Sequence, residues 1–232
     1  MSTVDKQRFK WYYKYEYEID QGAFNMNKGK FYVFEGIDGC GKTTQAVLLR
    51  NKLEEIGHKA VITKEPTDRP IGLLIRKIMS GEASVDKRAV VHLFAADRID
   101  HITAPETGIL ALLERGTDVI SDRYVYSSYA YQSIDSGTDT VSEANRTAEQ
   151  LLVPDAVIYI DIPPEAAMER IETARESIEI YENIQRLTKV RENYLNVFQR
   201  LKDQVNIFMY DGTTPPETIA DEIWKALLED RG

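Results

Sequence analysis

The sequence has little cysteine, no long apolar run and no excess of positive charge, and each shortage excludes a class of protein. The single cysteine, Cys40, excludes an intramolecular disulfide and fits a reducing compartment. No apolar run approaches the roughly 18 residues that cross a bilayer, so we expect no transmembrane helix and no membrane partner. The first residues show no apolar stretch with a small-residue cleavage site, so we expect no secretory signal. Together these shortages predict a cytoplasmic protein.

The charge balance is acidic, since 38 Asp and Glu oppose 29 Lys and Arg to give a formal net charge of −9. Broad binding of nucleic acids needs a basic surface, so we expect no nucleic-acid partner. An acidic protein that binds a phosphate must concentrate its positive charge locally. The positions of individual lysines and arginines therefore point to where a phosphate ligand would bind.

From residue 30 onward, β-rich apolar runs alternate with amphipathic stretches. The chain of 232 residues, 43% of them hydrophobic, suits one compact domain that buries about 70–75% of its unfolded surface. The pattern predicts strands at 31–35, 60–63, 118–121, 156–161 and 205–210. It predicts helices at 43–56, 70–80, 86–101, 107–115, 142–152, 164–200 with an interruption, and 215–229. Such alternation is typical of a doubly wound α/β fold, here a five-stranded parallel sheet flanked by helices, with ligands at the carboxyl ends of the strands.

Residues 1–28 differ in composition from the rest and predict an N-terminal extension to a main domain at 29–232. Within the extension, residues 9–18 are dense in aromatics that alternate partly with charges, a pattern typical of a strand or of an arm laid on a surface. We interpret the extension as packed on its own domain or on a second subunit. Stacking on nucleic-acid bases is the alternative, which Glu16 and Glu18 weaken.

A glycine-rich segment, GIDGCGKT at residues 36–43, follows the first predicted strand and precedes a predicted helix. It is a complete G-x-x-x-x-G-K-[ST] loop in the context that this motif requires. Its glycines let main-chain N–H groups surround a polyphosphate, and the helix N-terminus adds a partial positive charge. Lys42 can then reach the β- and γ-phosphates, and the Thr43 hydroxyl can hold Mg²⁺. The loop predicts a nucleoside triphosphate site, in which Cys40 is a small filler or, alternatively, a redox sensor.

A polar pair, Asp122 and Arg123, stands at the end of a predicted buried strand and therefore at the ligand edge of the sheet. A carboxylate there can help to hold Mg²⁺, directly or through water. An arginine there offers a planar, permanently charged fork to a phosphate. The alternative is an ion pair on the surface.

Phe94 and Arg98 lie four residues apart on a predicted helix and so share one of its faces. A ring beside a guanidinium can stack on a nucleobase while the guanidinium donates a hydrogen bond to the edge of the base. Spacing alone favours the alternative, a core phenylalanine beside a solvated arginine.

Four motifs, in the order of the chain, resemble those of the thymidylate kinase family over about residues 30–228. The most specific is DRYVYSSYAYQ at 122–132, which resembles D-R-Y-x-x-S-x-x-A-Y-Q. EGIDGCGKTT at 35–44 resembles E-G-x-D-G-x-G-K-T-T, KEPT at 64–67 resembles the R-E-P-[GT] turn, and LFAADR at 93–98 resembles the helix that contacts thymine. The resemblance implies a P-loop nucleoside monophosphate kinase, transfer of phosphate from ATP to dTMP with Mg²⁺, and a homodimer.

The resemblance also implies residue roles. Asp38 would accept a hydrogen bond from the sugar 3′-OH, and Tyr131 would block a 2′-OH. Phe94 would stack on thymine, and Arg98 would donate to its O4. Two arginines would hold the dTMP phosphate, Arg76 and Arg123. The dTMP site would also include Glu65, Pro66, Ser128 and Gln132; the ATP site would comprise Gly36, Gly39, Gly41, Lys42, Thr43 and Thr44; and the metal site, Thr43 and Asp122.

Phosphoryl transfer requires alignment of the reacting groups and neutralisation of charge by Lys42, Mg²⁺ and a mobile arginine. In one branch of the family this arginine directly follows the aspartate of the phosphate loop, where the present chain has Gly39. The other branch draws it from a lid, expected here at about 170–182, although Ile180 stands where the family usually has arginine. The expected catalytic residues are Lys42, Asp38, Arg123, Arg175 as the first choice among lid arginines, and Arg170.

Two alternatives to a dTMP kinase stay open from the residues alone. One is another nucleoside monophosphate kinase or a deoxynucleoside kinase on the same fold; a pair of arginines at the acceptor site favours a monophosphate. The other is a non-catalytic nucleotide-binding module, which the presence of Lys42 and Arg123 disfavours.

Overall fold

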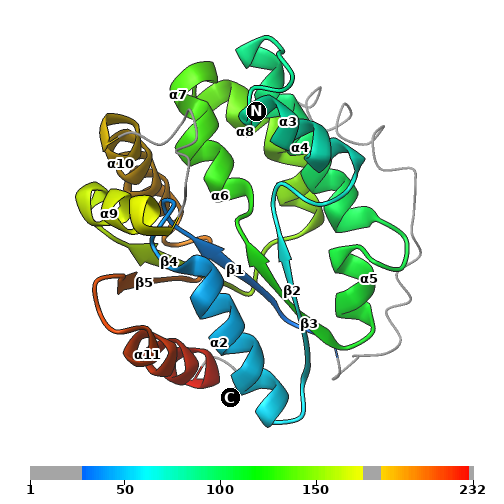
Figure 1. Ribbon diagram of the computed structural model, residues 1–232. Helices are drawn as coiled ribbons and strands as arrows, with labels where there is room; N and C mark the ends of the chain where they lie inside the picture. Colours follow the sequence, from blue (N-terminus) through cyan, green and yellow to red (C-terminus); the bar gives the residue numbers. More distant parts are fainter. Residues whose placement is uncertain (1–27, 175–183, 230–232) are drawn as a thin grey trace, which may run out of the picture.

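In the computed structural model, which describes residues 28–174 and 184–229, a five-stranded, all-parallel sheet forms the centre of the molecule (Figure 1). The strand order is β2-β3-β1-β4-β5. The strands are β1 (Phe31–Glu35), β2 (Lys59–Lys64), β3 (Thr117–Asp122), β4 (Ala156–Asp161) and β5 (Ile207–Asp211). The predicted α/β class and the five parallel strands are confirmed, with β5 beginning two residues later than expected.

The helices follow the predicted pattern over most of the described chain. They are α2 (Lys42–Glu55), α3 (Pro70–Met79), α4 (Lys87–Thr103), α5 (Ile109–Glu114), α6 (Val125–Ser127), the π-helical turn η2 (Ser128–Gln132), α7 (Ser133–Ser136), α8 (Thr138–Leu151), α9 (Pro164–Ala174), α10 (Ile184–Leu201) and α11 (Pro216–Glu229). The long pattern at 164–200 is divided into α9 and α10, and the residues between them lie outside the described part. Two differences stand out: α8 begins at Thr138 instead of 142, and residues 125–136 are helical although no helix was expected there.

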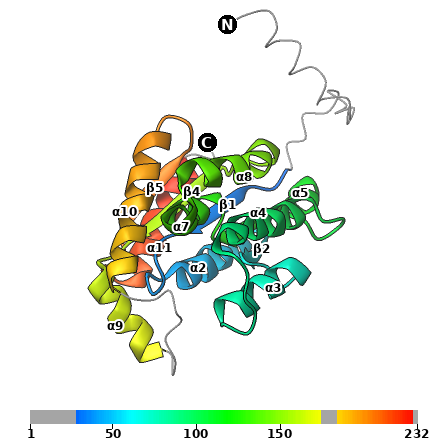
Figure 2. The ribbon, with the colours of Figure 1, turned by 90° about the horizontal axis from the view of Figure 1, so that it is seen from above.

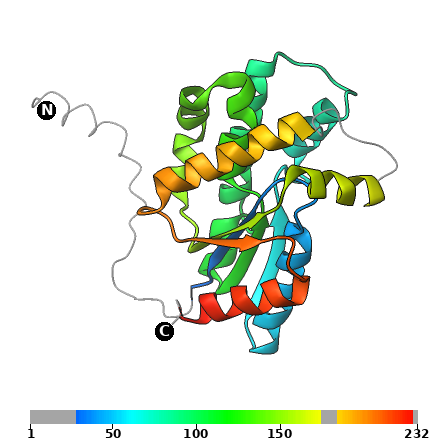
Figure 3. The ribbon, with the colours of Figure 1, turned by 90° about the vertical axis from the view of Figure 1, so that its left-hand side faces the viewer.

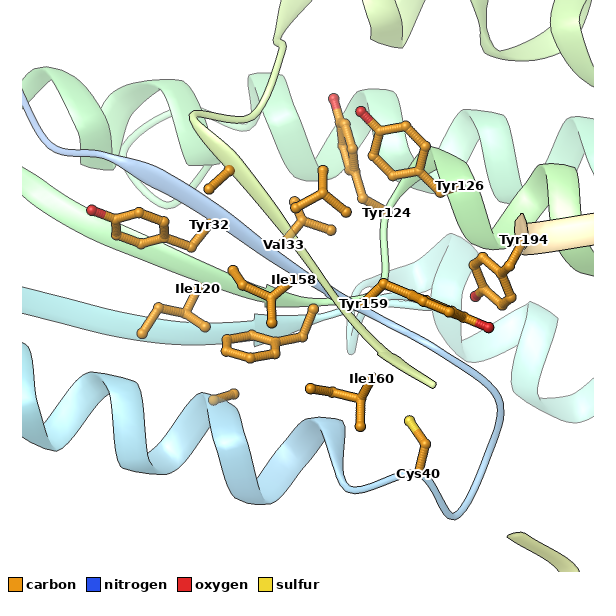
Figure 4. Close-up of a cluster of buried hydrophobic side chains, with 14 of the residues drawn as sticks. Tyr32, Val33, Cys40, Ile120, Tyr124, Tyr126, Ile158, Tyr159, Ile160 and Tyr194 are labelled. Atoms are coloured by element: carbon orange, nitrogen blue, oxygen red, sulfur yellow. The ribbon is translucent and has the colours of Figure 1, made fainter. Parts of the chain in front are cut away.

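Helices cover both faces of the sheet, which explains why its strands read as continuous apolar runs. Figure 3 shows α2 and α11 side by side below the sheet, with α10, α7 and α8 above it. All five residues of β1 are buried. The core continues into the buried tyrosines of Figure 4, among them Tyr124, Tyr159 and Tyr194. The centre of the molecule is therefore apolar but carries several hydroxyl groups.

The register places the charged strand ends side by side at one edge of the sheet. Phe34 of β1 is level with Asp122 of β3, and Glu35 is level with Tyr159 of β4. β1 lies between β3 and β4, so the chain leaves it at the point where the strand order reverses. In a doubly wound sheet, this edge is where ligands bind.

The N-terminal extension and part of the expected lid lie outside the described residues. Only Lys28 of the extension, and residues 170–174 of the lid expected at 170–182, are described. The division into an extension and a main domain stays a prediction. Among the helices of the described ranges, none is long and apolar enough to cross a bilayer.

Candidate functional site

The phosphate loop leaves β1 and turns directly into α2, as the sequence predicts (Figure 1). Gly41 precedes the helix with φ 102°, a left-handed conformation that glycine adopts without steric cost. Lys42, the first residue of α2, is 6% exposed. Its Nζ donates to the carbonyl oxygens of Gly36 and Ile37, both at 3.0 Å, and lies 3.9 Å from Asp38 Oδ1. The ammonium group is thus held within the loop, where a phosphate would lie.

Gly39 lets α9 pack closely against the phosphate loop. Its φ is +78°, and a Cβ built there would lie 2.6 Å from the carbonyl oxygen of Ala167 and 3.2 Å from Ile171 Cγ1. Arg170, on the same helix, donates to the carbonyl oxygens of Gly212 at 2.9 Å and of Gly39 at 3.4 Å. The position that holds arginine in one family branch is therefore in contact with another helix here.

Thr43 and Asp122, the two predicted metal ligands, are brought together by the fold. The Thr43 hydroxyl donates to Asp122 Oδ2 at 2.7 Å. Within the described residues, no cluster of three or more His, Cys, Asp or Glu could hold a metal ion. Mg²⁺ at a nucleotide site needs only one or two protein oxygens, because phosphates and water supply the rest. A hydroxyl and a carboxylate beside the phosphate loop therefore fit Mg²⁺.

A pocket of about 470 Å³ opens over the loop and gathers most of the residues that were predicted to bind ATP. Gly36 is not among its lining residues but turns the chain out of β1. Lys64, at the end of β2, lines the pocket and was not expected there. The lining residues are Asp38, Gly39, Gly41, Lys42, Thr43, Thr44, Lys64, Glu65, Asp122, Arg123 and Arg170.

Arg123 is held from two sides at the edge of this pocket. Its φ of 79° is unusual for a residue with a side chain. Its Nη2 donates to Asp38 Oδ1 at 2.5 Å and to the Tyr131 hydroxyl at 3.2 Å, and the guanidinium lies 4.8 Å from the centre of the Tyr131 ring. Its Nη1 donates to Ser127 Oγ at 3.0 Å. The side chain is 16% exposed, so its charge stays accessible to a ligand.

Arg98 is buried far more completely, at 1% exposure, and forms an ion pair with Glu65. Its Nε donates to Glu65 Oε2 at 2.8 Å, and its Nη2 donates to the carbonyl oxygen of Tyr124 at 3.1 Å. Its Nη1 donates to Ser128 Oγ at 3.1 Å and to Asn145 Oδ1. The alternative of a solvated arginine at this position is wrong, because the side chain lies inside the protein.

Glu65 also contacts His101, whose Nδ1 lies 3.1 Å from Glu65 Oε1. The His101 Nε2 lies 2.7 Å from the Thr63 hydroxyl. Glu65 precedes a cis peptide bond to Pro66, and its main-chain N–H donates to the carbonyl oxygen of Asp122. The carboxylate that pairs with Arg98 is therefore fixed by strands β2 and β3 as well as by α4.

A second pocket lies next to the first and shares Asp38 with it. It brings together Phe94, Tyr131 and Gln132, which were predicted to contact dTMP. Arg98 and Ser128 are buried and are not among its lining residues. The lining residues are Asp38, Ile75, Ile78, Met79, Lys87, Val90, Leu93, Phe94, Tyr131, Gln132, Asp135, Ser136 and Arg186.

Arg76 lies away from the lining of both pockets. Its Nη1 donates to the carbonyl oxygen of Pro66 at 2.7 Å, and its Nη2 donates to that of Thr67 at 2.5 Å and to Asp68. In this structure, its guanidinium holds the turn that follows β2. Its expected role in binding a phosphate stays a prediction.

Several residues of the site were missed by sequence reasoning. Glu35 lies in the motif at 35–44 and Ser127 in the motif at 122–132, so their positions within these motifs could have identified them as site residues. Asn145 and Tyr194 reach the site from helices far along the chain, and nothing local marks them. Lys87, Asp135 and Arg186 line the second pocket, where Asp135 is 2.9 Å from Arg186 Nη2 and 3.6 Å from Lys87 Nζ. The first-choice lid arginine, Arg175, lies outside the described residues.

Comparison with known proteins gives consistent matches. A family model for thymidylate kinase matches residues 34–223, which contain both pockets. The probable thymidylate kinase of Methanococcus aeolicus is 40% identical over 204 residues, covering 86% of this chain and 96% of that protein. That of Thermococcus kodakarensis is 43% identical over 177 residues, covering 72% and 83%. The thymidylate kinase of Leptospira borgpetersenii is 35% identical over 204 residues, covering 88% and 95%.

The packing of α9 on the phosphate loop can be tested with a single methyl group. Gly39→Ala should lower the free energy of unfolding by more than the roughly 1–2 kcal/mol that a left-handed conformation costs a non-glycine residue, because its Cβ also meets Ala167. Gly57→Ala is the matched control, since φ is +85° there and a Cβ would meet nothing within 4 Å. Urea denaturation measures both. Equal losses in the two variants would show that the contact between α9 and the loop is not tight.

Proposed function

The chain belongs to the thymidylate kinase family and phosphorylates dTMP to dTDP, and from this premise we propose how its residues divide the work. As a thymidylate kinase it binds ATP and dTMP. The observation that carries the proposal is that two pockets meet at Asp38, one over the phosphate loop and one beside Phe94. A donor phosphate in the first would therefore face an acceptor nucleotide in the second.

The first pocket is proposed to hold ATP. The Lys42 ammonium would exchange the carbonyl oxygens of Gly36 and Ile37 for oxygens of the β- and γ-phosphates, a short movement from its present contacts. Thr43 and Asp122 would hold Mg²⁺, as their 2.7 Å contact supports. When bound, Mg²⁺ neutralises charge on the phosphate oxygens. The protein then contributes mainly alignment and electrostatic stabilisation.

Arg123 is proposed to bind the phosphate of dTMP. It lines the ATP pocket beside Asp38, which both pockets share, so it lies where the donor and acceptor phosphates would meet. Its charge is partly accessible, and Asp38 and Tyr131 fix its guanidinium on one side. A permanently charged fork is the group that suits a phosphate. Asp38 and Tyr131, on the wall of the second pocket, are then placed for the sugar.

Phe94, Arg98, Ser128 and Gln132 are proposed to recognise thymine. The Phe94 ring lines the second pocket, where it can stack on a base. Arg98 is neutralised by Glu65, so it acts as a hydrogen-bond donor with little net charge, which suits a neutral carbonyl more than a phosphate. Four hydrogen bonds and the ion pair with Glu65 engage all three nitrogens of the guanidinium, so a bond to thymine O4 would compete with a present contact such as that to Ser128 Oγ.

We also propose a homodimer in the cytoplasm. Dimerisation is supported by the exposure of Leu73 and Leu74 on α3, which are 48% and 40% exposed in the single chain. Contiguous exposed apolar patches mark protein–protein contacts, and in a dimer these leucines would belong to such a patch. The cytoplasmic location is supported by the single, unpaired cysteine.

The first prediction for this function concerns the base. Cytosine presents an amino donor where thymine presents O4, so with dCMP the Arg98 donor would face another donor. A buried polar group left unpaired rejects the wrong ligand strongly, and we expect kcat/KM for dTMP to exceed that for dCMP on the order of 10²-fold or more. A coupled assay with ATP and each of dTMP, dCMP, dGMP and UMP measures this. Comparable values for dCMP and dTMP would overturn the assignment of Arg98.

The second concerns the lid arginines. The phosphate loop has no arginine at position 39, and Arg170 donates to two main-chain carbonyl oxygens. Arg175 is therefore our first choice for stabilising the negative charge on the transferred phosphoryl group. We expect Arg175→Ala to lower the single-turnover rate by about 10³–10⁵-fold with dTMP affinity retained. Arg170→Ala should mainly weaken ATP binding, and Arg170→Lys is its charge-retaining control. If Arg170→Ala lowers the single-turnover rate steeply and Arg175→Ala does not, the catalytic arginine is Arg170.

The third concerns the N-terminal extension. If the extension packs on the domain or on a second subunit, away from the dTMP site, removing residues 1–27 should leave KM for dTMP within about twofold of the full chain. Stability or dimer affinity should fall if the extension packs on the domain or on a second subunit. Steady-state kinetics and sedimentation measure the two effects. A large rise in KM in a stable, dimeric truncation would place the aromatic residues at the dTMP site.

A further inference from the structure

Tyr194 of α10 places its hydroxyl at the centre of a buried polar cluster behind Arg123. The side chain is fully buried. Its hydroxyl lies 2.8 Å from Glu35 Oε2, 2.8 Å from Ser127 Oγ and 3.4 Å from Arg123 Nη1. A phenol can donate and accept at once, so it can donate to Glu35 while it accepts from Arg123. It therefore links a buried carboxylate to the outer guanidinium.

Glu35 is the anchor of this cluster. It is fully buried at the end of β1, and its Oε1 accepts from the main-chain N–H groups of Tyr124 at 2.8 Å and Ser127 at 3.2 Å. Its Oε2 accepts from Ser127 Oγ at 2.7 Å as well as from Tyr194. Burial raises the pKa of Glu35, and the charge of Arg123 opposes that rise. The carboxyl thus fixes the turn that directly follows Arg123.

The two ends of the Arg123 guanidinium are held differently. The Nη2 end faces Asp38 and Tyr131, which line the dTMP pocket. The Nη1 end faces Ser127 and Tyr194 in the interior. An arginine has four rotatable side-chain bonds, so two groups on the inner end restrict its orientation before any ligand binds.

The aromatic surroundings make Tyr194 a rigid support. Its ring packs against Tyr159 and Phe198, with ring centres 5.2 and 5.7 Å apart (Figure 4 shows Tyr159 and Tyr194). These contacts belong to the ring and do not depend on the hydroxyl. Phenylalanine at this position would keep the packing and lose only the polar contacts.

We propose that Tyr194 is a positioning residue for the acceptor phosphate: its hydroxyl, anchored on Glu35 and Ser127, orients the Arg123 guanidinium toward that phosphate. This inference rests on the proposed assignment of Arg123 to the dTMP phosphate. It ties α10 to the phosphate end of the dTMP site and predicts an effect on the phosphate alone.

The test compares dTMP with thymidine, which has the same base and sugar but no phosphate. Tyr194→Phe should raise the calorimetric Kd for dTMP about 5- to 20-fold and leave the affinity for thymidine unchanged within about twofold. Tyr126→Phe is the matched control, since Tyr126 is also buried, lies 5.6 Å from the Phe198 ring, and within the described residues makes no hydrogen bond to Glu35 or Arg123. It should change neither affinity.

Arg123→Ala separates the inference from the assignment beneath it. If Arg123→Ala leaves the dTMP affinity unchanged, the assignment of Arg123 fails, and the role of Tyr194 fails with it. If Arg123→Ala weakens dTMP and spares thymidine, the assignment stands. Adding Tyr194→Phe to Arg123→Ala should then cause no further loss of dTMP affinity.

Two results would overturn the inference while the assignment of Arg123 stands. One is a change in dTMP affinity below twofold in Tyr194→Phe. The other is an equal loss for dTMP and thymidine, which would mean that the variant loosens the whole site. Ser127→Ala removes the hydroxyl to which Arg123 Nη1 donates, and it should show the same selective loss for dTMP. Should Tyr194→Phe not fold, Ser127→Ala tests whether the inner contacts of Arg123 Nη1 orient its guanidinium, and equal losses for dTMP and thymidine would again overturn the inference.

Discussion

The burial of positive charge is the constraint on which this site depends, because an arginine removed from water must be paired and hydrogen-bonded. The fold meets this requirement twice at one edge of the sheet. Arg98 pairs with Glu65 in the interior, and Arg123 pairs with Asp38 at the pocket edge. Glu35 is a further carboxyl, buried like that of Glu65, and it holds the turn after Arg123. These carboxylates lie at or just after the ends of parallel strands, so the sheet itself sets the positions of the arginine partners.

The two arginines differ in how completely they are neutralised, and this difference separates their chemistry. Arg98 is 1% exposed and its partner 3%, so the pair offers directed N–H groups and little net charge. The Arg123 side chain is 16% exposed and its partner 30%. With Arg98 at the base and Arg123 at the phosphate, as proposed, a neutral carbonyl and a charged phosphate would meet different electrostatic surroundings within one site. Under this proposal, discrimination between bases and affinity for the phosphate would be separable properties of the chain.

The sequence predicted those parts of the structure whose signal is local. The strands and most helices follow from short apolar patterns. The phosphate loop with Lys42 and Thr43 follows from its glycine motif, and Asp122 follows from its place at a strand end. The helical segment after Tyr124 was not predicted, since main-chain contacts to Glu35, 89 and 92 residues away in sequence, fix its start. Asn145 and Tyr194 were missed for the same reason, because their contacts cross 47 to 159 residues.

Gly39 has a consequence for how such enzymes can change over time. The atom that a side chain at this position would add lies 2.6 Å from the main chain of α9, so the loop and the helix occupy the space jointly. An arginine in the loop and a helix at this distance are therefore mutually exclusive. A lineage with this arrangement cannot acquire a loop arginine by one substitution without displacing α9 together with Arg170.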